Sequence, residues 1–195
     1  MNTSPETVPL WNKGWYRFAR EQASPNYGSR PAGARIDLIV VHSISLPPGE
    51  FGNGQIQRLF ANQLDWDAHP YFQSIRGLEV SAHFFISRNG ELWQFVSCDD
   101  RAWHAGESFY RGRASCNDDS IGIELEGLED GLFESAQYET LASISAALLR
   151  QYPVTHLAGH EHIARGRKQD PGAGFDWPLL QRALGLPAKY FPESV

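Results

Sequence analysis

The sequence predicts an α/β domain in which a mixed central β-sheet is flanked by helices on both faces. Three observations lead to this prediction. Residues 36–41 form an almost unbroken run of β-branched and apolar side chains, which is typical of a buried central strand. Residues 134–151 place apolar side chains at helical spacing. Strand-like segments lie both before and after helical ones, as in layered folds that combine the two.

Length and composition indicate a single globular domain. The chain has 195 residues, of which 42% are hydrophobic and 21% are charged. These values are ordinary for a domain that buries a core without disulfide bonds. We expect one domain over residues 14–187, a flexible N-terminal tail over 1–13 and a C-terminal tail over 188–195. The net charge of -6 argues against nucleic acid as a partner, because binding phosphate needs a basic surface.

The sequence also indicates in which cellular compartment the protein is expected to lie. No stretch approaches the roughly 18 to 20 apolar residues that a membrane span requires, so we expect no membrane partner. Residues 1–13 lack the basic start and apolar run of a signal peptide. Without an export signal, Cys98 and Cys116 are expected to be reduced thiols. We therefore expect a cytoplasmic protein, and we expect it to be a monomer.

In the N-terminal half, residues 15–23 predict a short helix that ends in a turn rich in proline and glycine. The central strand over 36–41 ends at His42, a position where functional groups of α/β proteins are common. Residues 45–77 form a long excursion that contains one short helix, over 55–63, and is otherwise irregular. Long excursions of this kind are usually binding loops or lids.

In the C-terminal half, the pair Asn89-Gly90 between two apolar runs predicts a β-hairpin. The following elements are a strand over 120–127, the helix over 134–151 that Pro153 stops, and a brief strand over 155–158. A last helix begins at the capping residue Asp176 and ends at Leu184.

Residues 159–172 are rich in metal-ligating and cationic side chains and hold few apolar ones. His160, His162 and Asp170 lie here, with Asp170 directly before a Pro-Gly turn. One histidine and the aspartate would supply two of the three protein ligands of a catalytic zinc site. The spacing does not decide between the two histidines, and the third ligand must come from elsewhere in the chain.

Three further side chains are candidates for chemistry, each with a plainer alternative. His42 follows a strand, where a lone histidine is more often a capping residue than a ligand. Glu124 lies in an apolar strand, so it could be a general base of raised pKa, although a solvated strand face shared with Glu126 would also explain it. Lys168 could stabilise an oxyanion, although its local sequence fits a solvent-facing lysine.

The chain resembles the AmpD family of bacterial cytosolic 1,6-anhydro-N-acetylmuramyl-L-alanine amidases, from about residue 24 to residue 177. The wider superfamily includes phage lysozyme-type amidases and peptidoglycan recognition proteins. The resemblance rests on several motifs in the same order: Val40-Val41-His42-Ser43, Ala68-His69-Pro70-Tyr71-Phe72, Ser81-Ala82-His83, Arg101-Ala102-Trp103-His104-Ala105-Gly106, Cys116-Asn117-Asp118, Ser120-Ile121-Gly122-Ile123-Glu124-Leu125-Glu126-Gly127 and Arg167-Lys168-Gln169-Asp170-Pro171-Gly172.

This resemblance implies one zinc ion held by His42, His160 and Asp170. It also implies that Glu124 activates the attacking water and that Lys168 stabilises the tetrahedral intermediate. The fold it implies is the mixed sheet of the amidase and peptidoglycan-recognition type. Three further residues, expected to contact the muropeptide, are Trp103, His104 and Arg167. The resemblance gives His162 no ligand role, and we interpret His83, inside a strand, as structural.

The sequence departs from the family pattern at a few positions. Ser43 often corresponds to asparagine and Glu161 to cysteine, and Arg165-Gly166 replaces a pair that contains proline. Some members carry arginines where Glu79 and Ser115 stand, and those arginines can meet the acidic stem peptide. The departures leave the proposed metal and base positions intact but leave the stem-peptide preference open.

The function that the resemblance implies is zinc-dependent hydrolysis of the amide between the lactyl group of 1,6-anhydro-N-acetylmuramic acid and L-alanine. Its role would be peptidoglycan recycling, which in some bacteria also controls β-lactamase induction. One alternative is a non-catalytic peptidoglycan-binding module of the same superfamily. Another is an envelope amidase with polymeric substrates. A weaker hypothesis makes residues 45–77 a lid over the substrate.

Overall fold

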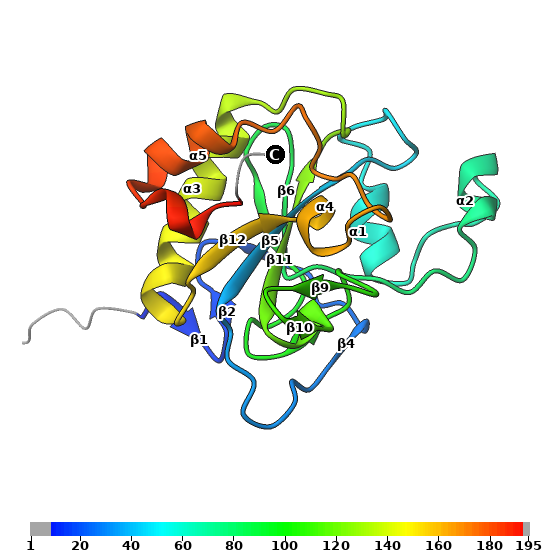
Figure 1. The fold of residues 1–195 in the computed structure, drawn as a ribbon. Helices are drawn as coiled ribbons and strands as arrows, with labels where there is room; N and C mark the ends of the chain where they lie inside the picture. Colours follow the sequence, from blue (N-terminus) through cyan, green and yellow to red (C-terminus); the bar gives the residue numbers. More distant parts are fainter. Residues whose placement is uncertain (1–8, 193–195) are drawn as a thin grey trace, which may run out of the picture.

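A computed structural model describes residues 9–192 and has a six-stranded mixed sheet at its centre (Figure 1). Four neighbouring strands run parallel, β7 is antiparallel to β6, and the edge strand β3 is parallel to β7. The order across the sheet is β12 (His156–Gly159), β5 (Leu38–Ile44), β11 (Ser120–Glu126), β6 (Phe84–Ile86), β7 (Leu92–Gln94) and β3 (Arg20–Glu21). The predicted mixed sheet is therefore confirmed.

Helices cover both faces of this sheet, as predicted. The long helix α3 (Ser135–Gln151) and α5 (Trp177–Leu184) lie together on one face (Figure 1), where Val41 of β5 shares a buried cluster with Leu141 of α3. The opposite face is covered by α1 (Gln55–Phe60) and by α4 (His160–Ile163). Because side chains alternate along a strand, Val40 points to this second face and contacts the cluster beneath α4.

Short elements complete the part of the chain that the structure describes. They are β1 (Trp11–Asn12), β2 (Trp15–Tyr16), β4 (Tyr27–Gly28), α2 (Pro70–Ser74), β8 (Arg101–Ala102), β9 (Phe109–Tyr110), β10 (Arg113–Ala114), and the 3-10 helices η1 (Cys116–Asp118) and η2 (Ala188–Tyr190). Among the described residues, no helix combines the length and apolar character needed to span a bilayer.

Several predicted elements are confirmed with small changes of boundary. The Asn89-Gly90 hairpin joins β6 to β7, and Asp176 caps α5 by accepting a hydrogen bond from the backbone N–H of Leu179 at 2.7 Å. Strand β5 continues through Ile44, so His42 lies inside the strand and not after it. The sheet pairing of β5 with β11 extends over all seven residues of both strands, which explains the added length.

The predictions at the two ends of the domain were wrong in part. Residues 15–23 form the strands β2 and β3 instead of a helix, because β2 pairs with β1 and β3 pairs with β7. The expected tail over 1–13 includes Trp11, whose ring lies 4.9 Å from that of Tyr16. The expected tail over 188–195 includes Phe191, which is buried in the core. Residues 1–8 and 193–195 lie outside the described range.

Two short helices were not predicted. The first, α2, begins after His69, whose Nδ1 accepts a hydrogen bond from the N–H of Tyr71 at 3.1 Å. The second, α4, begins at His160 inside the segment over 159–172, for which no helix was expected. This helix changes the direction of successive side chains, which has consequences for the two histidines that it carries.

Candidate active site

Two predicted site residues lie side by side on the central strands. His42 of β5 and Glu124 of β11 are paired in register in the parallel ladder, so their side chains project from the same face of the sheet. Both are buried, with only 1% of His42 and 9% of Glu124 exposed. The sheet therefore places a histidine and a carboxylate next to each other at the surface on which α4 lies.

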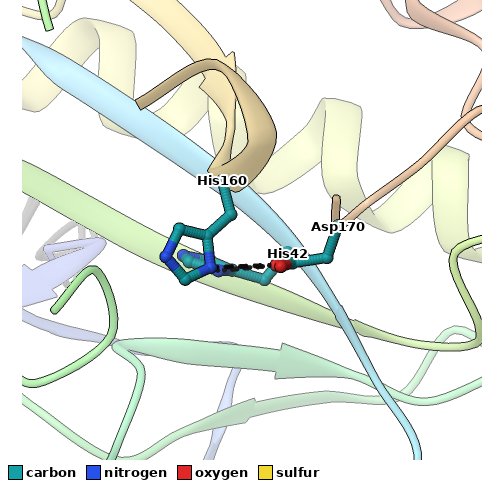
Figure 2. A group of neighbouring side chains, drawn as sticks. All are labelled: His42, His160 and Asp170. Atoms are coloured by element: carbon teal, nitrogen blue, oxygen red, sulfur yellow. Dashed lines mark hydrogen bonds and ion pairs between the residues drawn. The ribbon is translucent and has the colours of Figure 1, made fainter. Parts of the chain in front are cut away.

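The C-terminal motif brings His160 and Asp170 to the same place (Figure 2). His160 follows strand β12, which pairs with β5, and the carbonyl oxygen of Asp170 accepts a hydrogen bond from the N–H of Glu161 at 2.8 Å. The Nδ1 atoms of His42 and His160 are 3.0 Å apart, and each lies 3.1 Å from Oδ2 of Asp170. The three predicted ligands thus each bring one atom to the same position.

The chemistry of these three atoms fits a zinc ion. The other ring nitrogen of His160, Nε2, lies 3.1 Å from the carbonyl oxygen of Ala105, which can only accept. His160 Nε2 therefore carries the proton, and its Nδ1 presents a lone pair to the cluster. Two imidazole nitrogens and one carboxylate oxygen match the ligands of a catalytic zinc site, which leaves a fourth position for water.

The protonation states that the protein imposes suit metal binding. Burial lowers the pKa of His42 to about 4, so its ring is neutral at pH 7. Burial alone would raise the pKa of Asp170, but the adjacent imidazoles of His160 and His42 hold it well below its usual value. A neutral imidazole and an ionised carboxylate are the forms that coordinate a cation.

The surroundings of Glu124, in contrast, favour its protonated form. Burial raises its pKa well above the usual value, the charge of Asp170 raises it further, and only the charge of Lys168 opposes this. Its Oε2 atom is buried and has no hydrogen-bond partner among the described residues. A buried carboxylate without a partner and with a raised pKa is suited to exchange protons with a reacting group.

A cleft of about 880 Å³ opens over these residues. Lys168 lies exposed at its wall, and its charge acts on both Glu124 and His42. The segment over 45–77 contributes a second wall, which is largely apolar. The lining includes His42, Ser45, Leu46, Leu59, Phe60, Tyr71, Ile75, Leu78, Glu79, Trp103, His104, Glu124, His160, Arg167, Lys168 and Asp170.

The three predicted substrate contacts differ in how free their polar atoms are. Trp103 is half-buried in the cleft wall. Arg167 donates to the carbonyl of Ala105 at 2.7 Å and to that of Glu107 at 2.5 Å, which fixes its guanidinium along the loop. Substrate contact stays a prediction for all three residues, and both ring nitrogens of His104 already have partners within the protein.

The two remaining histidines of interest lie outside the metal cluster. Nδ1 of His162 accepts a hydrogen bond from the N–H of Gly159 at 3.0 Å, and its ring lies against Trp177. The first turn of α4 thus sends His160 to the cluster and His162 away from it. His83 is fully buried, and its Nδ1 accepts a hydrogen bond from the N–H of Gly122 at 3.0 Å.

Sequence reasoning missed the groups that surround the ligands. His42 Nε2 lies 2.9 Å from His104 Nδ1, and His104 Nε2 lies 3.1 Å from Oγ of Ser120. Oδ1 of Asn117 accepts hydrogen bonds from the N–H groups of His104 and Ala105, at 3.1 and 2.8 Å. Asn117 and Ser120 lie in motifs of the sequence, but nothing in the residue pattern assigns them to the metal cluster.

The profile of the N-acetylmuramoyl-L-alanine amidase family matches residues 32–173, a range that contains all three candidate ligands and Glu124. The chain belongs to this family. The 1,6-anhydro-N-acetylmuramyl-L-alanine amidase AmpD of Salmonella typhimurium (strain SL1344) is 50% identical over 179 residues, which cover 91% of this chain and 96% of the relative.

Solved structures of this family share the fold. The crystal structure of a selenomethionine AmpD derivative is 49% identical, has a TM-score of 0.88, and is matched over 90% of this chain and 99% of its own. A complex of the amidase AmiD from E. coli with the substrate anhydro-N-acetylmuramic acid-L-Ala-D-gamma-Glu-L-Lys is 28% identical, with a TM-score of 0.55. That match covers 89% of this chain and 65% of AmiD. The amidase fold that the resemblance implied is therefore confirmed.

Proposed function

We propose that this protein is a zinc amidase that cleaves the amide between the lactyl group of 1,6-anhydro-N-acetylmuramic acid and L-alanine in muropeptides. The observation that carries the proposal is the meeting of three ligand atoms, from His42, His160 and Asp170, within 4.8 Å of one another beside the buried Glu124. The AmpD relatives, which are about half identical over most of the chain, support the choice of substrate.

The two histidines and the aspartate would hold zinc. When bound, this ion would acidify a water molecule and polarise the amide carbonyl. The Glu124 carboxylate accepts a proton from the attacking water as the new carbon–oxygen bond forms. It returns that proton to the amine nitrogen as the carbon–nitrogen bond breaks. The second proton of the water then passes from the new carboxyl group to the amine, so that the products are a carboxylate and the ammonium group of L-alanine. The Lys168 ammonium stabilises the negative charge that develops on the carbonyl oxygen.

The cleft has features that suit such a substrate. Its volume of about 880 Å³ can accommodate a sugar ring and several residues of a stem peptide. Trp103 offers an aromatic surface to the sugar, and the cations of Arg167 and Lys168 suit the carboxylates of the peptide. The E. coli relative AmiD was solved with a substrate of this chemical class.

The proposal includes a cytoplasmic, monomeric enzyme that recycles cell-wall fragments. Cys98 and Cys116 are both unpaired, as is usual in a reducing compartment. The alternative of a non-catalytic binding module is disfavoured, because the chain keeps three converging ligands and a base. Movement of residues 45–77 as a lid stays a prediction.

The test is digestion of a defined anhydromuropeptide by the zinc-loaded protein, with mass analysis of the products. We expect release of the intact stem peptide, and a slower reaction on the N-acetylmuramyl substrate that lacks the anhydro ring. Asp170→Ala is expected to lose both zinc and turnover, and Lys168→Ala to keep zinc and lose turnover. Full activity in a carefully chelated sample would contradict the proposed mechanism.

A further inference from the structure

We infer that Ser120 and His104 act as positioning residues that fix the tautomer of His42 through a directed chain of hydrogen bonds. The chain runs from the carbonyl of Cys116 through the Ser120 hydroxyl and the His104 imidazole to Nε2 of His42. This inference rests on the proposed metal-binding role of His42. It assigns His104 a role toward the metal ligand and not toward the substrate.

The direction of the chain follows from its first member. The carbonyl oxygen of Cys116 can only accept, so the hydroxyl proton of Ser120 points to it. Toward His104, the Ser120 oxygen is therefore an acceptor, and Nε2 of His104 must carry the proton across their 3.1 Å contact. Nδ1 of the neutral His104 ring is then an acceptor. It takes a proton from Nε2 of His42 at 2.9 Å, which leaves the lone pair of His42 on Nδ1.

The opposite direction would leave a buried contact without a proton. If His104 donated from Nδ1 to His42, its unprotonated Nε2 would need the hydroxyl proton of Ser120. The oxygens of Ser120 and Cys116 would then face each other as two acceptors. Ser120 is fully buried, so no solvent is available to relieve such a contact.

The His104 ring packs directly against the central strand β11, at Gly122. A Cβ atom at Gly122 would lie 2.5 Å from Cγ of His104, so the ring rests where only a glycine leaves room. The backbone on both sides of this ring is also fixed, since Oδ1 of Asn117 accepts from the N–H groups of His104 and Ala105. These contacts place the imidazole over Gly122, with its Nδ1 beside Nε2 of His42.

The same loop orients the second imidazole. The carbonyl of Ala105, the next residue, accepts the proton of His160 Nε2 at 3.1 Å. Residues 104 and 105 thus fix both histidine ligands in the tautomer whose Nδ1 lone pair faces the carboxylate of Asp170. Outer partners of this kind set the orientation and basicity of metal-ligating histidines.

The proton positions can be measured directly in the zinc-loaded protein, where the cation lies between the two Nδ1 lone pairs and the Asp170 carboxylate. Long-range proton–nitrogen NMR spectra of a sample labelled with 15N-histidine distinguish a ring protonated at Nε2 from one protonated at Nδ1. We expect His42, His104 and His160 all to be protonated at Nε2 at pH 7.5. A His104 ring protonated at Nδ1 would overturn the inference, whatever the activity of the enzyme.

A matched pair of variants tests the consequence for zinc. Ser120 and Ser145 are both fully buried serines, but Oγ of Ser145 has no hydrogen-bond partner among the described residues. Ser120→Ala is expected to leave His104 in a mixture of tautomers and to weaken zinc binding about 10-fold, as measured by competition with a chelator. Ser145→Ala is expected to retain the wild-type tautomers and zinc affinity.

A conservative probe of the ring itself is His104→Phe, which keeps an aromatic ring over Gly122 but removes both nitrogens. It is expected to weaken zinc binding by about 10- to 100-fold. Wild-type tautomers and zinc affinity in both Ser120→Ala and His104→Phe would overturn the inference. If the tautomers are as stated but the wild-type protein does not cleave anhydromuropeptide, the proposed function fails and the positioning chain stands.

Discussion

His42 and Glu124 are register partners on the adjacent parallel strands β5 and β11. Neighbouring strands lie about 4.8 Å apart, so a metal ligand and the proposed base are held at a fixed separation by backbone hydrogen bonds. Neither position depends on a mobile loop. The central ladder is therefore the element that couples the proposed metal site to the proposed proton transfer.

Glu124→Gln is expected to abolish turnover without loss of zinc. Glutamine has the same shape but cannot accept the proton of the attacking water, and Glu124 is not one of the three converging ligands. The rate of hydrolysis should fall by about 10²- to 10⁴-fold, while zinc content measured by elemental analysis stays at the wild-type value. A variant that keeps the wild-type rate would show that the base lies elsewhere.

The same substitution is expected to stabilise the metal-free protein. The pKa of Glu124 is raised in the fold by burial, so the folded state prefers the protonated form. The stability that the protonated Glu124 contributes is fully present below the ordinary glutamate pKa. It is lost as the pH rises through the raised pKa of the folded state. At pH 8, Glu124→Gln should have a free energy of unfolding about 1–3 kcal/mol above the wild type. Urea unfolding should show this difference vanishing below about pH 4.

The strands and the long helix could be predicted from the sequence because their burial leaves a periodic pattern. The apolar runs that became β5 and β11, and the stripe of α3, are of this kind. Asp170 and the two histidines of α4 were found because ligating side chains cluster locally. The choice of His42 as the third ligand needed the family resemblance, since 118 residues separate it from His160.

The rest of the site could not be predicted, because it is made by backbone groups and by distant contacts. The carbonyls of Cys116 and Ala105 orient the two imidazoles, and a carbonyl has no signature in the sequence. The helix predicted over residues 15–23 was wrong for a related reason. Their composition suits a helix, but pairing with β1 and with β7 decides their structure.

Gly122→Ala is expected to disturb the metal site by displacing the ring of His104. The added Cβ would lie 2.5 Å from Cγ of His104, and the strand cannot move because it is paired on both sides. We expect zinc binding to weaken about 10-fold or more, and the free energy of unfolding to fall by about 1–3 kcal/mol. Gly28→Ala is the matched control, since a Cβ there meets nothing within 4 Å. Equal behaviour of the two variants would contradict the close contact.

Arg30→Met is expected to destabilise the segment that carries the ligand-orienting residues. The Arg30 guanidinium donates to four backbone carbonyls, those of Cys98, Asn117, Asp118 and Ser120, at distances of 2.9 to 3.2 Å. Methionine keeps the apolar stem but removes this donor from all four acceptors, which should cost about 3 kcal/mol in urea unfolding.

Zinc affinity should fall in the same Arg30 variant, because Asn117 and Ser120 hold the loop around His104. Arg35→Met, at an exposed arginine nearby in the chain, is the control and should change stability by less than about 0.5 kcal/mol. A loss of stability at Arg35 equal to that at Arg30 would show that the carbonyl contacts are not the cause.

His83 is expected to make the metal-free protein sensitive to acid. Burial, together with the charge of Arg30, lowers its pKa from 6.5 to about 3, so the unfolded chain binds more protons than the folded one between these values. The stability that its neutral ring contributes is present above pH 6.5 and is lost as the pH falls toward 3.

His83→Asn, whose amide oxygen can still accept from the N–H of Gly122, does not titrate in this range. Its free energy of unfolding, measured with urea from pH 8 to pH 4, should fall less steeply than that of the wild type, by up to about 1.4 kcal/mol per pH unit. A constant offset at pH 8 would report the change in packing, and an unchanged slope below pH 6 would assign the acid sensitivity to other buried histidines.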